Sequence, residues 1–358
     1  MPSEIEAFEF LNRYLKLAIL ISLPLAVLTD ILHFDSLVVF VLTAIAIIPI
    51  AKLIGDSTEA LAHYYSTGVS AVLNSTCGNL VEIVLAVFAI KAGLIDLVKA
   101  SITGSILGNI LLISGLSLIA GGFPRKELTF RKSTIEIQTS MLMIALAGLL
   151  TPTIFSLTTD RSPVILSDFV ALIMILVYII GIIFSFRYNK HIITPEARPV
   201  DEASPNGWSK RTAIAILGCS TIAAAFLSEI LIRSVEHVGK NFQLSELFIG
   251  VVVVAVIGNA AEHSSAITLA RKGKMDLSLE ITSASSIQIA LFAVPILVLA
   301  GLIMDTPVTL VFTLFEVIAV FLAVLLAHFV ASDGSTNWLE GLQLLSLYMI
   351  IAVTFFFM

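Results

Sequence analysis

Two related stretches of sequence decide the fold of this chain. "GNLVEIVLAVFAIKAGLIDL" (Gly78 to Leu97) returns as "GNAAEHSSAITLARKGKMDL" (Gly258 to Leu277), at an offset of 180 residues. Apolar matches are common in a chain this apolar, whereas matching polar residues are informative. The two copies share a Gly, an Asn, a Glu and an Asp, and the same register goes on without a gap to pair Ser105 with Ser285 and Glu136 with Glu316. This self-similarity predicts an internally repeated architecture.

The composition excludes an ordinary soluble protein. Of the 358 residues 58% are hydrophobic and only 13% are charged, and the mean hydropathy is strongly positive. These values are typical of a polytopic membrane protein surrounded by a lipid bilayer. The net charge of −6 would argue only weakly against nucleic acid in a soluble protein. Here the placement of each charge matters more than the sum, so no partner is inferred from the net charge, and a nucleic-acid partner is not expected. Cys77 and Cys219 lie in apolar runs and are expected to be small hydrophobic residues rather than a disulfide.

The transmembrane spans follow from length and hydropathy. A helix needs about 20 mainly apolar residues to cross the hydrocarbon layer. By this measure the chain has eleven candidates, with short connections that leave room for one membrane domain only. The expected spans are 14–34, 36–55 (with a continuation toward 66), 68–92, 97–121, 133–151, 167–187, 212–234, 245–270, 277–303, 307–330 and 339–357.

The repeat is expected to be inverted. Its two copies lie on the third and eighth spans, and five crossings between them mean that they enter the membrane from opposite sides. The predicted fold is an all-α polytopic membrane protein of about eleven helices. It consists of an extra N-terminal span (1–35), a first five-helix repeat (36–187), a cytoplasmic linker (188–211) and a second five-helix repeat (212–358). Lys and Arg concentrate before the first span and after even-numbered spans, which predicts a protein of the cell membrane with its N-terminus in the cytoplasm.

The repeated motif has the chemistry of a cation site. A carboxylate in a membrane span is costly and usually functional. Gly and Asn are poor helix formers, so the backbone at Gly78 can unwind and turn carbonyls toward a cavity. Facing copies of the motif would bring together two carboxylates, two carbonyls and two side-chain amides. Such oxygen-rich sites suit a hard cation such as calcium, and the near absence of sulfur and imidazole disfavours zinc or copper.

Charge balance suggests how such a site is used. Two ionised glutamates with one divalent cation are neutral, and two protonated glutamates are also neutral. The empty ionised site carries two unpaired charges in a low dielectric and is disfavoured. Cation and protons would therefore compete for one site. Inverted repeats are a common plan of secondary transporters with a site near the midplane, so we expect the exchange of one calcium for about two protons by alternating access.

The two motifs also resemble a known family. "GNLVE" and "GNAAEH", each on a span that is followed by a Ser-bearing one ("TGSILGN" and "SASSIQIALFAVP"), are similar to the signature repeats of calcium/proton exchangers, a branch of the calcium/cation antiporter superfamily. The resemblance implies that Glu82 and Glu262 bind calcium and take up protons, assisted by the carbonyls of Gly78 and Gly258. It also implies a set of residues that shape the site: Asn79, Asn259, Ser105, Ser285 and Gln288.

The chain departs from related exchangers in two ways. In the superfamily that the chain resembles, sodium/calcium exchangers carry a Thr-Ser-x-Pro-Glu type of sequence around the acid. Neither copy here has that Pro, which favours protons over sodium as the counter-ion. Members of the proton branch often carry an acidic helix in the linker. This linker has only Glu196, Asp201 and Glu202 in "PEARPVDEASP", so a regulatory role of that kind is not predicted.

Other polar residues have two interpretations each. Glu136 and Glu316 either lend charge or proton access to the site or only bond a neighbouring helix. Asp56, Glu59 and Glu229 near span ends form either an acidic vestibule or ordinary solvated helix ends. His263 either tunes the proton affinity of Glu262 or packs against another span. Asp96 and Asp276 are expected as helix N-caps.

Several other functions remain as alternatives. A sodium-coupled exchanger or a manganese antiporter would use the same oxygen-rich site, and a cation channel would also present acids to permeating ions. An intramembrane hydrolase is disfavoured because no HExxH or GxSxG sequence is present, and ATP-driven pumping lacks a Walker A sequence. We therefore expect a transporter rather than an enzyme, with no cofactor, and with calcium and protons as its ligands. The oligomeric state is not predicted.

Overall fold

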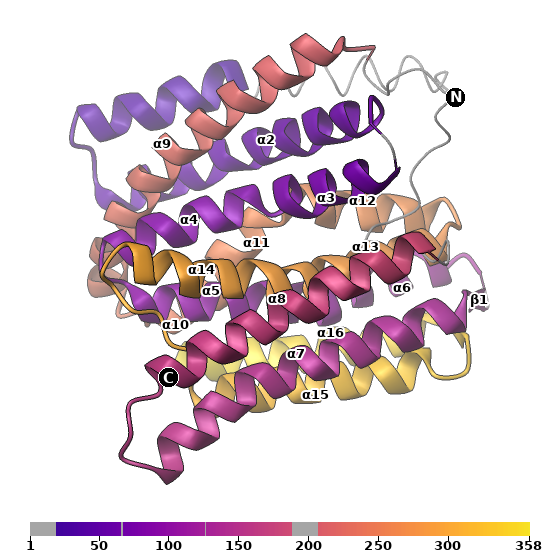
Figure 1. Cartoon of the computed structure of the whole chain (residues 1–358). Coiled ribbons are helices and arrows are strands. Elements are labelled where there is room, and N and C mark those ends of the chain that lie inside the picture. The colour runs from indigo at the N-terminus through magenta and orange to yellow at the C-terminus, as the bar shows by residue number, and fades with distance from the viewer. Residues whose placement is uncertain (1–18, 66, 126, 188–206) are drawn as a thin grey trace.

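The protein is an almost entirely helical bundle. The computed structural model describes residues 19–65, 67–125, 127–187 and 207–358, and most of its helices run roughly side by side (Figure 1). Within these residues, eight helices are long and apolar enough to cross a membrane, or ten if each of two sharply bent pairs is one crossing. The all-α membrane fold is thus confirmed. The count of eleven stays a prediction, because the first expected span starts outside the described residues and its described part is the short helix Ile19–Ile31.

The first half of the chain contains most of the elements that were expected from hydropathy. The elements are α2 (Ser36–Ala62), α3 (Thr67–Gly78), α4 (Leu80–Lys91), α5 (Ile95–Leu107), the π-helical η1 (Gly108–Ile113), α6 (Ser114–Gly122), β1 (Leu128–Thr129), α7 (Lys132–Thr158) and α8 (Val164–Arg187).

The second half repeats much of this order. Its elements are α9 (Lys210–Phe242), α10 (Glu246–Phe248), η2 (Ile249–Val254), α11 (Ala255–Gly258), α12 (Ala260–Arg271), α13 (Met275–Gln288), η3 (Ile289–Ala293), α14 (Val294–Ile303), α15 (Leu314–Ala331), β2 (Ser335–Thr336) and α16 (Trp338–Phe357). The short strands β1 and β2 pair antiparallel, so a loop from each half meets at one end of the bundle.

Corresponding elements keep the spacing of the sequence repeat. α4 and α12 begin and end 180 residues apart, and both follow a break of more than 40° at Asn79 or Asn259. Figure 1 shows the α3–α4 pair and the α11–α12 pair running in opposite directions. After each pair a glycine with positive φ, Gly93 at 79° or Gly273 at 80°, turns the chain into the next helix. Glycine is needed there because the left-handed region strains residues with a Cβ.

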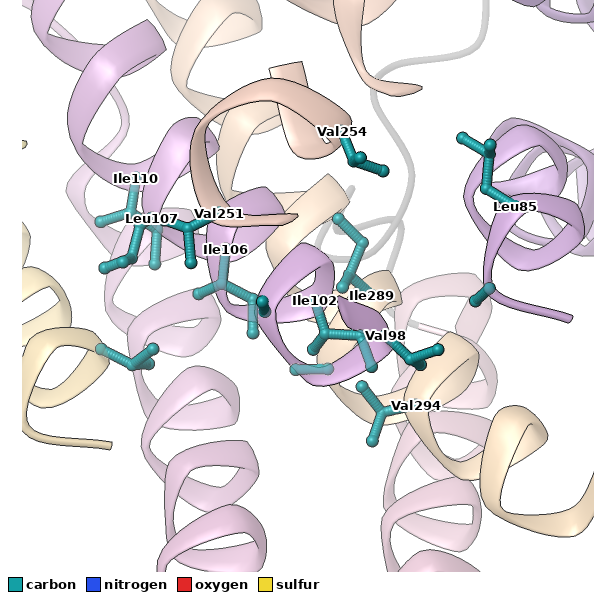
Figure 2. Packing of buried hydrophobic residues seen from close by; sticks show 14 of the residues in the cluster. Leu85, Val98, Ile102, Ile106, Leu107, Ile110, Val251, Val254, Ile289 and Val294 are labelled. Carbon is teal, nitrogen blue, oxygen red and sulfur yellow. The ribbon is translucent and has the colours of Figure 1, made fainter. Parts of the chain in front are cut away.

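The core is built around α5 and α13, which continue through the π-helical turns η1 and η3. Figure 2 shows apolar side chains of α5, such as Ile106 and Leu107, beside Val251 of η2. The backbones approach so closely that a Cβ on Gly104 would overlap the Val251 carbonyl, and one on Gly250 would lie 2.5 Å from the Ala100 Cβ. Small residues at helix crossings are the usual means of close packing in membranes.

Two expectations about helix starts are wrong. The span expected at 307–330 begins at Leu314, because Pro307 and the cap at Thr313 leave the preceding connector extended. Its buried backbone is satisfied by side chains: the N–H of Leu310 donates to Ser167 Oγ at 3.0 Å, and the N–H of Phe312 donates to Thr153 Oγ1 at 3.1 Å. Asp96 and Asp276 are not N-caps, since α5 and α13 each begin one residue before them and place the carboxylates in the first turn.

Part of the expected linker lies outside the described residues. This part includes Glu196, Asp201 and Glu202. The described end of the linker contacts the end of α2, where the Tyr64 hydroxyl donates to the Trp208 carbonyl at 2.6 Å and Lys210 Nζ lies 4.3 Å from the Tyr65 ring. The two cysteines are both free, and Cys219 is exposed.

Candidate cation-binding site

The two repeated glutamates meet across the bundle. Glu82 is in the first turn of α4 and Glu262 in the first turn of α12. A Cβ placed on Gly258 would lie 3.2–3.4 Å from Glu82 side-chain atoms, and one placed on Gly78 would lie 3.7 Å from Glu262 Oε1. Each carboxylate therefore rests against the glycine of the other copy. The two carboxylates are also within electrostatic range of one another.

Each glutamate keeps one oxygen available. The Oε2 atoms of Glu82 and Glu262 are buried, and neither has a hydrogen-bond partner among the described residues. Burying an unpaired carboxylate oxygen is expensive, so such groups are usually neutralised by a proton, a cation or a donor. The arrangement therefore favours a proton or a cation at each of the two carboxylates.

Two buried amides stand directly before the glutamates. Asn79 Nδ2 donates to Gln288 Oε1 at 2.8 Å. Asn259 Nδ2 donates to Ser105 Oγ at 2.9 Å and to the Ala255 carbonyl at 3.0 Å. These two bonds use both N–H donors of the Asn259 amide. Its Oδ1 is a buried acceptor that has no partner in the described part of the chain.

One residue of this network was not singled out by the sequence. Asn109 Nδ2 donates to Ser285 Oγ at 2.9 Å, and Asn109 Oδ1 lies 3.2 Å from His263 Nε2. The Ser285 hydroxyl in turn bonds the carboxylate of Glu262. Because His263 and Glu262 are adjacent in the chain, these bonds close a ring around the second glutamate. The only signal in the sequence is an amide one turn after Ser105 in the apolar run "SILGNILLI".

Irregular backbone positions these side chains. Asn109 belongs to the π-helical turn η1, and Gln288 ends α13 directly before η3. A π-turn adds a residue to the helical turn and rotates the following side chains, and such turns are frequent at functional sites. The polar residues of α5 and α13 are thereby directed at the breaks in the two bent pairs.

The other acidic candidates lie at helix ends and surfaces. Glu136 is exposed one turn after the start of α7, with its carboxylate 3.7 Å from Lys132 Nζ. Asp56 pairs with Lys52 at 3.2 Å near the end of α2, and Glu59 and Glu229 are exposed. Glu316 is buried, but it caps the start of α15. The positions of these five residues therefore favour the interpretation as solvated or structural residues over the interpretation as an acidic vestibule.

The donor set fits a hard cation. No group of three or more His, Cys, Asp or Glu side chains that could hold a metal occurs in the described ranges. Beyond the two carboxylates, the polar atoms around the site are amide and hydroxyl oxygens and one imidazole. Calcium accepts such mixed oxygen ligands, whereas zinc sites need several His, Cys or carboxylate ligands.

Comparison with known proteins identifies the family. The chain matches the family described as sodium/calcium exchanger protein over residues 35–187 and again over residues 212–357. The chain belongs to this family. The double match covers both halves that the sequence repeat relates.

Members of the family with curated names are similar over nearly the whole chain. The Ca(2+)/H(+) antiporter ChaA of Bacillus subtilis is 38% identical over 97% of this chain and 99% of its own length. The Ca(2+)/H(+) antiporter of Aphanothece halophytica is 38% identical over 95% of both chains. The vacuolar calcium ion transporter of Schizosaccharomyces pombe is 34% identical over 94% of this chain and 84% of its own. These relatives are transporters, in agreement with the expectation that the chain is not an enzyme.

Solved structures confirm the family fold. The structure of native YfkE superposes with a TM-score of 0.84 at 36% identity, over 96% of this chain and 100% of that one. The H+/Ca2+ exchanger CAX superposes with a TM-score of 0.70 at 16% identity, over 96% of this chain and 92% of that one, which is a likeness of fold.

Proposed function

We propose that this chain is a secondary antiporter of the cell membrane that exchanges calcium for protons. The relatives named as calcium/proton antiporters support this function, because the similarity runs over nearly the full length of both chains. The absence of a Pro beside either glutamate also supports protons as the counter-ion. The excess of Lys and Arg after even-numbered spans supports a cytoplasmic N-terminus.

Glu82 and Glu262 are the shared binding groups for calcium and protons in this proposal. The observation that carries it is the buried, unpartnered Oε2 of each carboxylate, with each side chain resting against the glycine of the opposite copy. Calcium would bridge the two carboxylates, with the Oδ1 of Asn259 and the carbonyls of Gly78 and Gly258 as further oxygen ligands. These groups are held in place by hydrogen bonds that involve Asn79, Ser105, Ser285, Gln288 and His263.

The exchange follows from charge neutrality. When calcium leaves, two negative charges remain in a medium of low dielectric, and each must be neutralised before the site can reorient. Two protons satisfy this condition, and so does one calcium. A site that keeps an unpaired negative charge is disfavoured. The protein therefore alternates between the calcium-loaded state and the doubly protonated state, and this alternation couples the two fluxes.

The test is calcium uptake into proteoliposomes under an imposed pH gradient. We expect the unmodified protein to accumulate calcium, and Glu82→Gln and Glu262→Gln each to abolish proton-driven uptake. Glu136→Gln is the matched control, since it removes a carboxylate that is exposed and paired with a lysine. Proton-driven calcium uptake by Glu82→Gln at the rate of the unmodified protein would contradict the proposed role of this residue.

A sodium-coupled exchanger is the second candidate, because the family description names sodium. A sodium gradient imposed at constant pH separates the two mechanisms, since proton coupling predicts no calcium accumulation under that condition. Manganese competes for the same oxygen ligands, so its selectivity against calcium is measured in the same vesicles. Currents that do not saturate and that never run against a gradient would indicate a channel instead.

A further inference from the structure

Glu316 is a buried carboxylate that lies outside the proposed cation site. It is 1% exposed, and both of its carboxyl oxygens accept hydrogen bonds. Its Oε1 accepts from Thr103 Oγ1 at 3.1 Å, and its Oε2 accepts from both the backbone N–H and the hydroxyl of Thr313 at 2.8 Å. Lys99 lies within electrostatic range and balances its charge. Through these bonds Glu316 ties two helices, α15 and α5, together.

The hydrogen bond from Thr103 to Glu316 connects α15 to the helix that carries Ser105 of the proposed cation site. Thr103 is buried on α5, two residues before Ser105. Ser105 accepts the Nδ2 donor of Asn259 and so decides where the Oδ1 of that amide points. A shift or rotation of α5 at Thr103 would be transmitted through the rigid helix to Ser105.

Glu316 stands on a firmly fixed segment. The connector before α15 is buried at Val308, Leu310 and Phe312. Its backbone is bonded by Ser167 of α8 and Thr153 of α7. In addition, Lys99 Nζ lies 3.5 Å from Thr309 Oγ1 of the same connector. The connector is thus a fixed support against which Glu316 can hold α5.

The other half of the molecule lacks this arrangement. The counterpart of Glu316 in the repeat is Glu136, which is exposed and pairs with Lys132. The counterpart of the capping Thr313 is Ser133, which lies inside α7 because that helix begins at Lys132 without a side-chain cap. The two repeat partners therefore differ: Glu316 bonds the central helix α5, whereas Glu136 pairs with Lys132 on its own helix. At the corresponding place in the other half, α13 is bonded instead by Arg131 through Glu280. Glu136 is thus a natural control for the test.

We propose that Glu316 is a positioning residue for calcium exchange: through Thr103 it fixes α5 so that Ser105 directs the Asn259 amide oxygen at the bound cation. This inference rests on the proposed function, and it adds a residue that acts on the site from another helix. In this proposal Glu316 positions α5, and the transported protons bind Glu82 and Glu262.

The experiment measures the KM for calcium, the maximal exchange rate and the pH profile in proteoliposomes. The variants are Thr103→Val, Glu316→Gln and the double variant. Loss of one hydrogen bond predicts a rise in KM of roughly three- to tenfold with a nearly unchanged maximal rate and pH profile. If Glu316 acts through Thr103, the double variant will resemble Thr103→Val rather than show the product of both effects.

Three controls make the result specific. Thr103→Ser keeps the hydroxyl and is expected to restore the unmodified KM, which tests the contact even if Glu316→Gln does not fold. Glu136 is the repeat counterpart of Glu316, and Ser283 is the repeat counterpart of Thr103. Glu136→Gln and Ser283→Ala are both expected to leave KM unchanged.

Multiplicative effects in the double variant, an effect of Glu136→Gln as large as that of Glu316→Gln, or a shifted pH profile would each overturn the inference. If the unmodified protein exchanges no calcium for protons, the proposed function fails instead. These two failures are therefore distinguishable.

Discussion

At the scale of single residues, the site depends on glycines as much as on carboxylates. Each glutamate lies in contact with the glycine of the opposite copy, and at Gly258 a Cβ would crowd the Glu82 side chain. The two contacts are unequal: the Cβ position of Gly258 is 3.2 Å from Glu82 Cγ, whereas that of Gly78 is 3.7 Å from Glu262 Oε1. The inequality distinguishes the two copies.

Alanine at these two glycines is predicted to have different effects. Gly258→Ala must displace the Glu82 side chain, whereas Gly78→Ala makes an ordinary van der Waals contact. We expect Gly258→Ala to weaken calcium binding about tenfold or more, on the scale of an overpacked site, and Gly78→Ala to weaken it less. Isothermal titration with calcium measures both, and equal affinities for the two variants would contradict the steric explanation.

Asn109 is predicted to stabilise the network around Glu262. Asn109→Leu removes the partner of His263 Nε2 and the donor to Ser285. Leaving buried polar groups without partners costs about 1–3 kcal/mol each, so the temperature of unfolding in detergent should fall. Ser264→Ala is the control, because this exposed hydroxyl bonds only the carbonyl of Ala261 on its own helix. Unchanged unfolding of Asn109→Leu would mean that water or rearranged side chains replace the amide.

At the scale of elements, the breaks and π-turns give the helices their function. A continuous α-helix through Asn79 or Asn259 would direct Glu82 and Glu262 along its own surface, whereas the bent pairs point them across the bundle. The turns that follow depend on the positive φ of Gly93 and Gly273. They have similar backbones but different surroundings, since a Cβ on Gly273 would lie 3.1 Å from Arg125 Nη2 and one on Gly93 would meet nothing within 4 Å.

Alanine substitution in these turns is predicted to destabilise the fold without altering the site. Gly93→Ala should cost about 1–2 kcal/mol, the strain of a non-glycine residue in the left-handed region. Gly273→Ala should cost more, because it also displaces Arg125 from its contacts with the carbonyls of Gly121 and Arg271. Thermal unfolding of the two variants side by side measures the difference. A larger loss for Gly93→Ala would show that the arginine moves aside freely.

At the scale of the whole molecule, two halves of the chain share one polar centre. The helices that hold it come from both halves, and α5 is in contact with the second half through η2 and α15 as well as through Asn259. Each half contributes one of the two glutamates. A cation bound between them, as proposed, would link the two halves, and protons in its place would keep the site neutral without that link.

The pH dependence of calcium binding is predicted from this shared centre. If protons and calcium compete for the two carboxylates as proposed, the apparent Kd for calcium should rise as the pH falls, with a slope approaching two protons per calcium. Calcium titrations over a series of pH values measure the slope. Glu262→Gln should reduce the slope by about one proton where binding is still detectable. An apparent Kd that is independent of pH would exclude the competition.

The sequence repeat predicts much of this architecture. Comparison of the two copies also has a limit, because it detects only residues that occur in both. Comparing the copies finds residues that occur twice, such as Glu82 and Glu262. It cannot find Asn109, whose counterpart is Ile289, and it paired Glu136 with Glu316 although their surroundings differ. Hydropathy placed most spans within a few residues but overran the connector before α15, where side chains rather than helical bonds satisfy the backbone.

The sequence by itself determined the membrane class, the order of spans, the two breaks and the pair of glutamates, because hydropathy, helix propensity and repetition are properties of neighbouring residues. Only the tertiary structure decided which polar groups share a hydrogen bond. Asn259 meets Ser105 across 154 residues, Asn109 meets Ser285 across 176 and Thr103 meets Glu316 across 213. Such contacts depend on how closely the helices pack, and a π-turn of a single extra residue is enough to change them.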